Sequence, residues 1–107
     1  MEGKGKILKI YIGENDQYND EPLYQEMIKL FKEKDLAGAT AMTGIEGFGL
    51  NSRIKSNHIW QLSEDLPVVI EVVDKAEKID EIIPTVKEMV KEGLITVEEV
   101  EIITYKA

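Results

Sequence analysis

Residues 68–73 constrain the fold more than any other part of the chain, because they are apolar on both faces of a strand apart from Glu71. Successive side chains of a strand point to opposite faces, so this pattern is typical of a central strand in a sheet that is covered on both sides. If the helices of a small sheet lie on one face, something else must cover the other. A second subunit is the simplest candidate.

Two other segments are predicted to be strands. In residues 7–12, the side chains of Leu8, Ile10 and Ile12 line one face, as expected from the period of two in a strand. Residues 97–105 form the last strand, with apolar side chains on both faces.

Two segments have apolar side chains at helical spacing. The first helix is expected to begin near Asp20, a suitable N-cap residue, and the second is expected to be capped by Asp74. Pro84 lies within the second pattern and predicts either a kink or only a loose turn before it, and Gly93 is expected to end that helix. The apolar stripes are Leu23, Tyr24, Met27, Ile28, Leu30 and Phe31 in the first, and Ile79, Ile82, Ile83, Val86, Met89 and Val90 in the second.

The predicted order is strand, helix, strand, strand, helix, strand, which is the ferredoxin-like βαββαβ arrangement. It implies an α+β fold with an antiparallel sheet and two helices on one face. The chain has 107 residues, enough for a single domain with one core, residues 1–107. Because Gly3 and Gly5 lie near the start, residues 1–5 are expected to be flexible.

The chain has no cysteine, one histidine and a formal net charge of −8. Disulfides, thiolate metal sites and cysteine nucleophiles are therefore excluded, and His58 lacks a second His or Cys to complete a zinc site. No catalytic and no metal-binding residue is predicted. The acidic charge argues against nucleic acid and an anionic membrane surface as partners, and no apolar run is long enough for membrane insertion. The missing cysteines and secretory signal fit a cytoplasmic protein.

Residues 38–49 form the most unusual stretch, a strand that begins at Gly38 and ends in a turn containing Gly44, Gly47 and Gly49. Glycine lets the backbone adopt positive φ and lets a partner approach closely. Two interpretations remain open at this point: the strand is bulged, or something packs against bare backbone.

A polar segment, residues 50–57, follows this turn. Amides exposed at such a turn can bind an anion, and arginine is suited to a phosphate or carboxylate. The alternative is a bulge leading into a mobile loop whose polar side chains serve only solubility. Residues 59–62 could form a further short strand. The candidate ligand-binding residues are Thr40, Gly44, Gly47, Phe48, Gly49, Asn51 and Arg53.

Residues 38–49 resemble the second strand of the PII signalling proteins, in which Gly-x-Thr-Val runs into Lys-Gly-Phe-Gly and then a long loop, the T-loop. A closer match is the PII-like family catalogued as domain of unknown function 190. Its members show Gly-Ile-x-Gly-Phe-Gly, then Ser-Arg-Ile, then Leu-Ser-x-Asp-Leu-Pro-Val-Val-x-Glu-x-Val-Asp. These motifs stand here at residues 44–49, 52–54 and 62–74. The similarity extends from residue 7 to residue 105, and the chain is identified as a member of this family.

The resemblance implies a ferredoxin-like subunit, a compact homotrimer, and a small-molecule site in the clefts between subunits. In PII proteins the ligand is an adenine nucleotide and the loop docks on a target protein. Family members are often encoded beside a fluoride-exporter-type membrane protein, which makes a membrane transporter a candidate partner. The resemblance carries the nucleotide-binding role to Thr40, Gly47 and Gly49, and to Asn51 in the place of a PII glutamine.

The chain also departs from the PII pattern. It has one more residue between Gly38 and Gly47, which predicts a bulge at Thr43-Gly44. After the second helix, PII proteins place two glycines and a lysine on the phosphates, whereas this chain has Lys91-Glu92-Gly93, and acids occupy its last strand. Burying a triphosphate without cations is costly. A less charged ligand, such as a nucleoside monophosphate or another anion, or no nucleotide at all, is therefore favoured.

The predicted function is a PII-like signalling or regulatory protein, not an enzyme, that binds a small ligand and presents residues 50–57 to a protein partner. An acylphosphatase-like hydrolase is disfavoured because residues 13–16 are acidic where that chemistry needs an arginine. The other alternative is a non-catalytic structural or metal-tolerance trimer, similar to the copper-tolerance proteins that share the fold. Without cysteine, soft-metal binding is weakly supported.

Overall fold

The computed structural model describes residues 1–47 and 65–107. The ferredoxin-like α+β prediction is confirmed, with one additional short hairpin before the first helix. The elements, in chain order, are β1 (Gly3–Gly13), β2 (Gln17–Tyr18), β3 (Glu21–Pro22), α1 (Leu23–Glu33), β4 (Ala39–Thr43), β5 (Pro67–Lys75), α2 (Ala76–Met89) and β6 (Leu94–Ile102).

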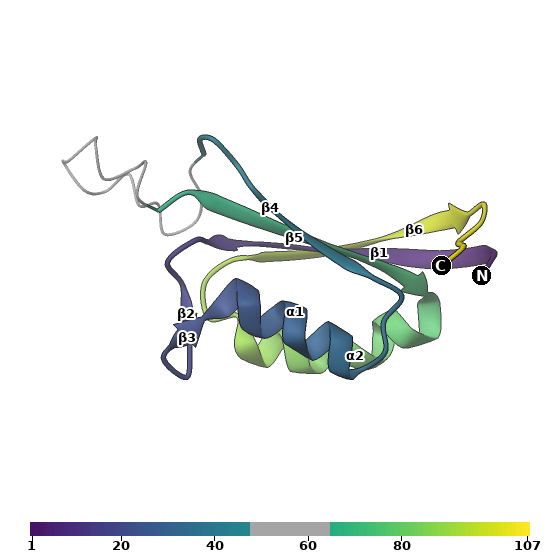
Figure 1. Cartoon of the computed structure of the whole chain (residues 1–107), viewed down its shortest axis with the longest axis horizontal. Helices are drawn as coiled ribbons and strands as arrows, with labels where there is room; N and C mark the ends of the chain where they lie inside the picture. The colour runs from purple at the N-terminus through teal and green to yellow at the C-terminus, as the bar shows by residue number, and fades with distance from the viewer. Residues whose placement is uncertain (48–64) are drawn as a thin grey trace.

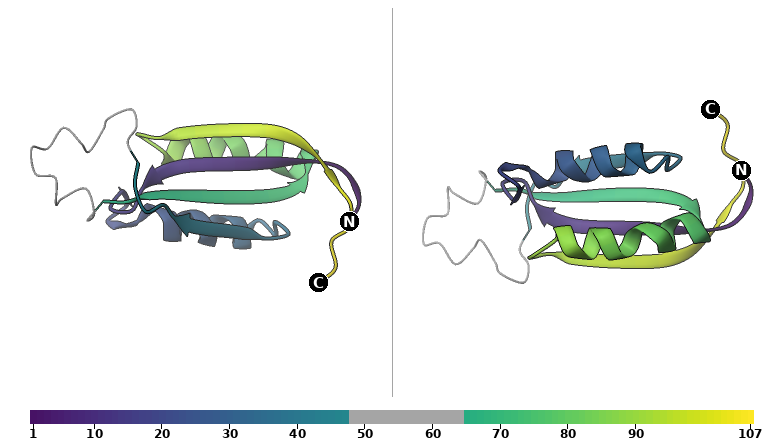
Figure 2. Two further views of the ribbon diagram at one scale, coloured as in Figure 1. Left: turned by 90° about the horizontal axis from the view of Figure 1, so that it is seen from above. Right: turned by 90° about the horizontal axis from the view of Figure 1, so that it is seen from below.

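The main sheet has the strand order β4-β5-β1-β6, and every neighbouring pair is antiparallel. Both helices cover the same face of this sheet (Figure 1). We call this face the helix side and the opposite one the open face, which no helix covers when the sheet is viewed from above (Figure 2, left). The strand at residues 68–73 is central, as predicted, because β5 lies between β4 and β1.

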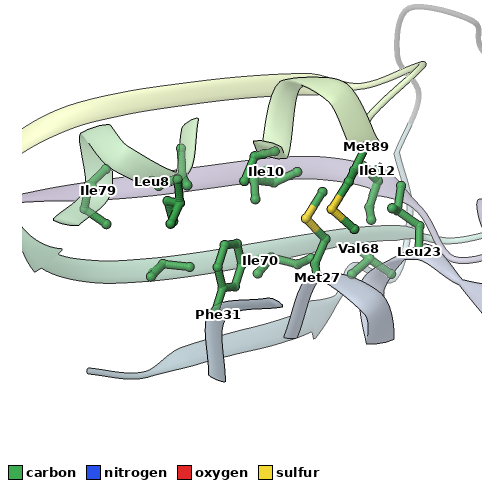
Figure 3. Close-up of a cluster of buried hydrophobic side chains, with 13 residues drawn as sticks. Leu8, Ile10, Ile12, Leu23, Met27, Phe31, Val68, Ile70, Ile79 and Met89 are labelled. Atoms are coloured by element: carbon green, nitrogen blue, oxygen red, sulfur yellow. The ribbon is translucent and has the colours of Figure 1, made fainter. Parts of the chain in front are cut away.

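The hydrophobic core fills the space between the sheet and the two helices (Figure 3). Phe31 and Met27 from α1 and Ile79 from α2 meet Leu8 and other strand residues there, each with 1% or less of its surface exposed. The predicted apolar stripes of both helices are confirmed, because all of their members are buried or packed against the core. The buried apolar residues are Leu8, Ile10, Ile12, Leu23, Met27, Phe31, Val68, Ile70, Val72, Ile79, Ile82, Val86 and Met89.

The open face is partly apolar. Directly paired residues share a face, so the register places Met42, Val69, Tyr11 and Leu94 in one row across all four strands. In this row Met42 is 44% exposed and Leu94 is 51% exposed. The next row is polar and consists of Thr40, Glu71, Lys9 and Thr96. The single chain therefore leaves large apolar side chains in contact with water.

Several element boundaries differ from the sequence-based predictions. β1 begins at Gly3, so Gly3 and Gly5 lie in the sheet, opposite Ile102 and Val100 of β6, where a flexible start was predicted. β6 spans Leu94–Ile102 rather than residues 97–105. The earlier start of β1 and the earlier start of β6 have the same cause. The two strands pair with each other over nine residues, so each extends as far as its partner does.

The predicted cap of α1 is wrong. Asp20 has φ 67 and lies in the turn of the β2–β3 hairpin. The helix begins instead at Leu23, and Pro22 in the N-cap position provides no side-chain hydrogen bond. The short hairpin was not predicted from the sequence.

The predicted cap of α2 is also wrong, since Lys75 occupies the N-cap position. Asp74 belongs to β5, and only 3% of its surface is exposed. Its Oδ2 accepts a hydrogen bond from the Ala37 amide at 2.8 Å, and its Oδ1 accepts one from the Lys75 amide at 2.6 Å. Asp74 therefore ties the connection between α1 and β4 to the end of β5.

Two further contacts hold the same connection. The Tyr105 hydroxyl donates a hydrogen bond to the carbonyl of Ala37 at 3.0 Å, and Lys78 Nζ donates to the carbonyl of Asp35 at 2.7 Å. Both backbone groups of Ala37 are thus bound by side chains from distant parts of the chain.

Pro84 does not end α2, which continues from Ala76 to Met89.

Gly93 does not occupy the C′ position of α2. It lies further along the chain, in the turn that leads to β6. A Cβ atom at Gly93 would lie 2.5 Å from the carbonyl oxygen of Tyr11. Glycine is needed there because the turn packs against β1. Within the described ranges, no helix is long and apolar enough to cross a membrane.

Candidate functional site

The structure describes three of the seven predicted ligand-binding residues, namely Thr40, Gly44 and Gly47. The other four lie outside the described residues, as do the polar segment 50–57, His58 and the possible strand at 59–62. Those four residues are Phe48, Gly49, Asn51 and Arg53.

Gly44 and Gly47 both pack against the ring of Pro67. A Cβ atom at Gly44 would lie 2.8 Å from Pro67 Cγ, and one at Gly47 would lie 3.3 Å from the same atom. The Gly44 amide donates to the Pro67 carbonyl at 2.7 Å, which continues the regular pairing of Ala39–Thr43 with β5. The predicted bulge at Thr43-Gly44 is therefore wrong, and the second interpretation holds for these glycines: a proline ring packs against bare backbone.

This packing predicts a measurable effect of Gly44→Ala. The added methyl group must displace the Pro67 ring, so we expect the free energy of unfolding to fall by about 1 to 2 kcal/mol. The measurement is urea denaturation of both single variants and of Gly44→Ala/Pro67→Ala. The alanine at position 44 should cost less when the ring is absent. Equal costs in both backgrounds would contradict the contact.

Thr40 lies apart from the two glycines. It belongs to β4, and its side chain shares the open face with Glu71, the residue paired with it. Thr40 and Gly44 are four positions apart, which corresponds to about 13 Å along a strand. Only a ligand that extends along the strand could contact both residues within one chain.

A groove on the opposite edge of the sheet brings two cations together. It lies between α2 and the first half of β6 and has a volume of about 460 Å³. Its apolar lining comes from both elements, and the exposed residues Lys87 and Lys91 also belong to its lining. We call it the lysine groove, and the residues that line it are Ile83, Lys87, Val90, Lys91, Gly93, Ile95 and Val97.

The sequence analysis considered Lys91 but missed Lys87. Lys87 belongs to the last turn of α2, whereas Lys91 lies beyond the helix end, in the turn that leads to β6. Helical spacing therefore does not predict that the two lysines line one groove. Within the described part of the chain, neither lysine forms an ion pair with a carboxylate. Two cations beside an apolar surface suit a small anion with an apolar body.

The lysine groove and the glycine turn lie at the same end of the sheet. Gly93 in the groove approaches Tyr11, which lies in the same row as Met42, two residues before Gly44. They are nevertheless on opposite edges, because β4 and β6 are the outermost strands. Three strand spacings separate these edges, or about 14 Å.

The loop after β1 offers no anion site of the acylphosphatase kind. The Gly13 amide donates a hydrogen bond to Asp16 Oδ2 at 2.9 Å, so a carboxylate of the same chain occupies it. The loop also carries Glu14 and no cation. Among the described residues, no group of three or more acidic or histidine side chains is placed to hold a metal ion.

Comparisons with known proteins identify the family of this chain. The family model DUF190, described as "Uncharacterized ACR, COG1993", matches residues 5–102. A UPF0166 protein of Aquifex aeolicus is 37% identical over 100 residues, covering 94% of each chain. A UPF0166 protein of Methanocaldococcus jannaschii is 40% identical over 95 residues, covering 88% of this chain and 87% of its own. The match of the family model over nearly the whole chain shows that this protein belongs to the DUF190 family.

Proposed function

We propose that this member of the DUF190 family is a PII-like regulatory protein without enzymatic activity. In this proposal it binds a small anion in the clefts of a homotrimer and signals the occupancy of those clefts to a protein partner. The observation that carries the proposal is the lysine groove, whose lining combines two lysines with apolar side chains in a chain with a net charge of −8.

The separation between the lysine groove and the glycine turn favours a site between subunits. The two features lie at the same end of the sheet but on opposite edges, so a single chain cannot place both against one small ligand. Two neighbouring copies can do so if the β4 edge of one approaches the β6 edge of the other. The exposed apolar side chains of the open face, such as Met42 and Leu94, also favour contact between copies, since burying them stabilises an assembly.

The charges near the groove favour a ligand with one or two negative charges. Glu88 and Glu92 are neighbours of Lys87 and Lys91 in the chain, and they oppose the field of the two ammonium groups. A triphosphate would bring more negative charge than two lysines offset. A nucleoside monophosphate fits the groove better, because its phosphate can contact the lysines while its base covers apolar surface.

The role of residues 50–57 in binding a partner comes from the resemblance to PII proteins. A membrane transporter is the candidate partner, and such a role requires a cytoplasmic location. The segment comes after β4 and after Gly44, the residue that follows β4 and packs against Pro67. A ligand bound between copies at this turn would therefore act at the base of that segment.

The proposal predicts that reversing the groove charge weakens anion binding. Isothermal titration calorimetry with AMP, ADP, ATP and inorganic phosphate should show binding of the monophosphate. Lys91→Glu and Lys87→Glu should each weaken it at least about tenfold, since each substitution replaces an attraction with a repulsion. Lys106→Glu is the matched control, because it makes the same charge change in the exposed C-terminal residues.

Native mass spectrometry of freshly purified protein provides the second measurement, since it reports subunit number and any bound ligand together. Equal affinities of Lys91→Glu and Lys106→Glu would exclude the lysine groove as the site. Absence of heat with all four anions, together with a trimer that carries no ligand, would contradict the binding function and leave a structural trimer.

A further inference from the structure

A smaller pocket lies between the end of α1 and the side of α2, away from the lysine groove. Its volume is about 150 Å³, below the roughly 300 to 1,000 Å³ of pockets that hold drug-sized ligands. We call it the helix pocket, and its lining residues all differ from those of the lysine groove. They are Lys34, Leu36, Lys78, Glu81, Ile82 and Thr85.

One side of α2 supplies most of this lining. Its members there lie three, four and seven positions after Lys78, a spacing that places side chains on the same side of a helix. Ile82 is buried, whereas Glu81 and Thr85 are exposed. The helix pocket therefore combines apolar contact with polar groups that a ligand can reach from solvent.

The end of α1 positions the lysine of α2. The amide of Leu36 donates to the carbonyl of Phe31 at 3.0 Å. The amide of Asp35 donates to the carbonyl of Lys32 at 3.1 Å, which completes the hydrogen-bond pattern of a Schellman motif. The motif places Asp35 in the left-handed region, with φ 59, and its carbonyl accepts a hydrogen bond from Lys78 Nζ at 2.7 Å. The ammonium group is thus held in place before a ligand binds.

The contact with Asp35 leaves the charge of Lys78 without a counter-ion. A carbonyl is a neutral acceptor, and an ammonium group has three donors, so two remain for a ligand. Within residues 1–47 and 65–107, neither Lys78 nor Lys34 forms an ion pair with a carboxylate. Lys78 is half-buried, and a partly buried charge without a counter-ion is costly. An anion in the helix pocket would remove that cost.

Glu81 determines which anion fits. Its carboxylate forms no ion pair with Lys78 in the described ranges, although the two residues are three positions apart on α2. An ionised carboxylate only accepts hydrogen bonds. It therefore repels an anion that has no proton, and it accepts a hydrogen bond from an anion that carries an O–H group. The hydroxyl of Thr85 can donate to either kind.

We infer that the helix pocket binds a small oxyanion that carries a proton, such as hydrogen phosphate or bicarbonate. Lys34 and Lys78 contact its charged oxygens, and Glu81 accepts its O–H group. The inference does not depend on the proposed function, because Lys78 and Lys87 are nine positions apart on α2, or about 14 Å along the helix axis. The bound oxyanion joins the end of α1 to α2, next to the connection that Asp74 holds.

Amide chemical shifts measured by nuclear magnetic resonance test this inference residue by residue. Phosphate, bicarbonate and sulfate are titrated separately into isotope-labelled protein at neutral pH and constant ionic strength. We expect phosphate or bicarbonate to shift the amides of residues 34–37 and 78–85. The tighter of the two should bind at least about tenfold more tightly than sulfate, which has no proton at this pH. Equal affinity for sulfate, or no shifts in these residues, would overturn the inference.

Lys34→Gln tests the cationic side of the helix pocket. It should weaken binding of the preferred oxyanion about tenfold, because it removes one positive charge and leaves the contact between Lys78 and Asp35 intact. Lys32→Gln is the matched control, since it makes the same change in the last turn of α1 and outside the lining. Equal affinities of the two variants would exclude the helix pocket as the site.

Glu81→Gln tests recognition of the proton. It keeps the size of the side chain and removes its charge, so sulfate should bind more tightly and the preference for a protonated oxyanion should disappear. Glu77→Gln makes the same change one turn earlier on α2, outside the lining, and should keep the preference. An equal gain in affinity for all three anions in Glu81→Gln would contradict recognition of the proton.

Lys91→Glu separates this inference from the proposed function. The variant changes the lysine groove and leaves the lining of the helix pocket unaltered, so the shifts in residues 34–37 and 78–85 should persist. Loss of those shifts in Lys91→Glu would place the oxyanion in the lysine groove and overturn the inference. Their loss in Lys34→Gln alone would support the helix pocket, whatever the outcome of the nucleotide titrations.

Discussion

Replacing Asp74 with alanine should lower the free energy of unfolding by about 3 kcal/mol or more. The carboxylate is buried and accepts hydrogen bonds from the amides of Ala37 and Lys75. Each hydrogen bond to a charged acceptor contributes roughly 1.5 to 3 kcal/mol, and alanine leaves both amides without that acceptor. The measurement is equilibrium denaturation in urea, with the midpoint and the slope reported separately.

Asp74→Asn is the matched control for this prediction. Its side chain has nearly the same shape but one oxygen in place of two, so it can accept only one of the two hydrogen bonds at the original geometry. We expect a loss of stability between those of the wild type and Asp74→Ala. If the alanine variant were as stable as the wild type, Asp74 would not hold the connection between α1 and β4.

Replacing Gly5 with alanine should lower the free energy of unfolding by about 2 to 3 kcal/mol. A Cβ atom at Gly5 would lie 2.5 Å from Ile102 Cδ1 and 2.7 Å from the carbonyl oxygen of Asp74. The end of the Ile102 side chain can rotate away, but the carbonyl belongs to the neighbouring central strand and can move only with it. Overpacking at such a position costs roughly 1 to 3 kcal/mol.

Gly38→Ala makes the same chemical change where there is space. No heavy atom outside its chain neighbours lies within 4 Å of a Cβ atom at Gly38, so alanine should leave stability unchanged or raise it by up to about 1 kcal/mol through the unfolded state. Thermal unfolding of the two variants in parallel gives the comparison. Equal melting temperatures for Gly5→Ala and Gly38→Ala would show that the sheet adjusts at Gly5 without cost.

The fold class and the core could be predicted from the sequence because they depend on hydrophobic periodicity. The spacing of Leu23, Met27 and Phe31 defines a buried helix face, and the alternation of Leu8 and Ile10 defines a buried strand face. Burial of these faces contributes most of the favourable free energy of folding. The spacing of apolar residues in the sequence therefore predicts which helices and strands form the core. Helix and strand ends depend on weaker local interactions, and several of their predicted positions were wrong.

The role of Asp74 could not be predicted because it depends on tertiary contacts. An aspartate just before a helical pattern is typical of an N-cap, and the sequence contains no sign that the amide of Ala37, 37 residues away, lies beside it. Pro67 and Gly44 present the same difficulty. Each residue suggests a local backbone role, and only the pairing of β4 with β5 shows that the two pack together.

The ligand-binding residues that the sequence suggested stay a prediction, and the lysine groove was not predicted. The glycine turn was identified from its composition, but the lysine groove depends on how α2 and β6 lie together, so Lys87 was missed. The apolar residues between these elements are not recognisable as a groove without the fold, because the same residues also fit a helix face and a strand.

The pairing of β1 with β6 has a consequence for how this protein emerges from the ribosome. Gly3 is opposite Ile102, so β1 cannot complete its pairing before β6 has been made. Until β6 has been translated, one side of β1 lacks its neighbour, and such unpaired strands favour aggregation in nascent chains. Contacts between residues so far apart in the chain also slow folding. A chaperone that acts during translation would therefore bind the unpaired β1 before β6 is made.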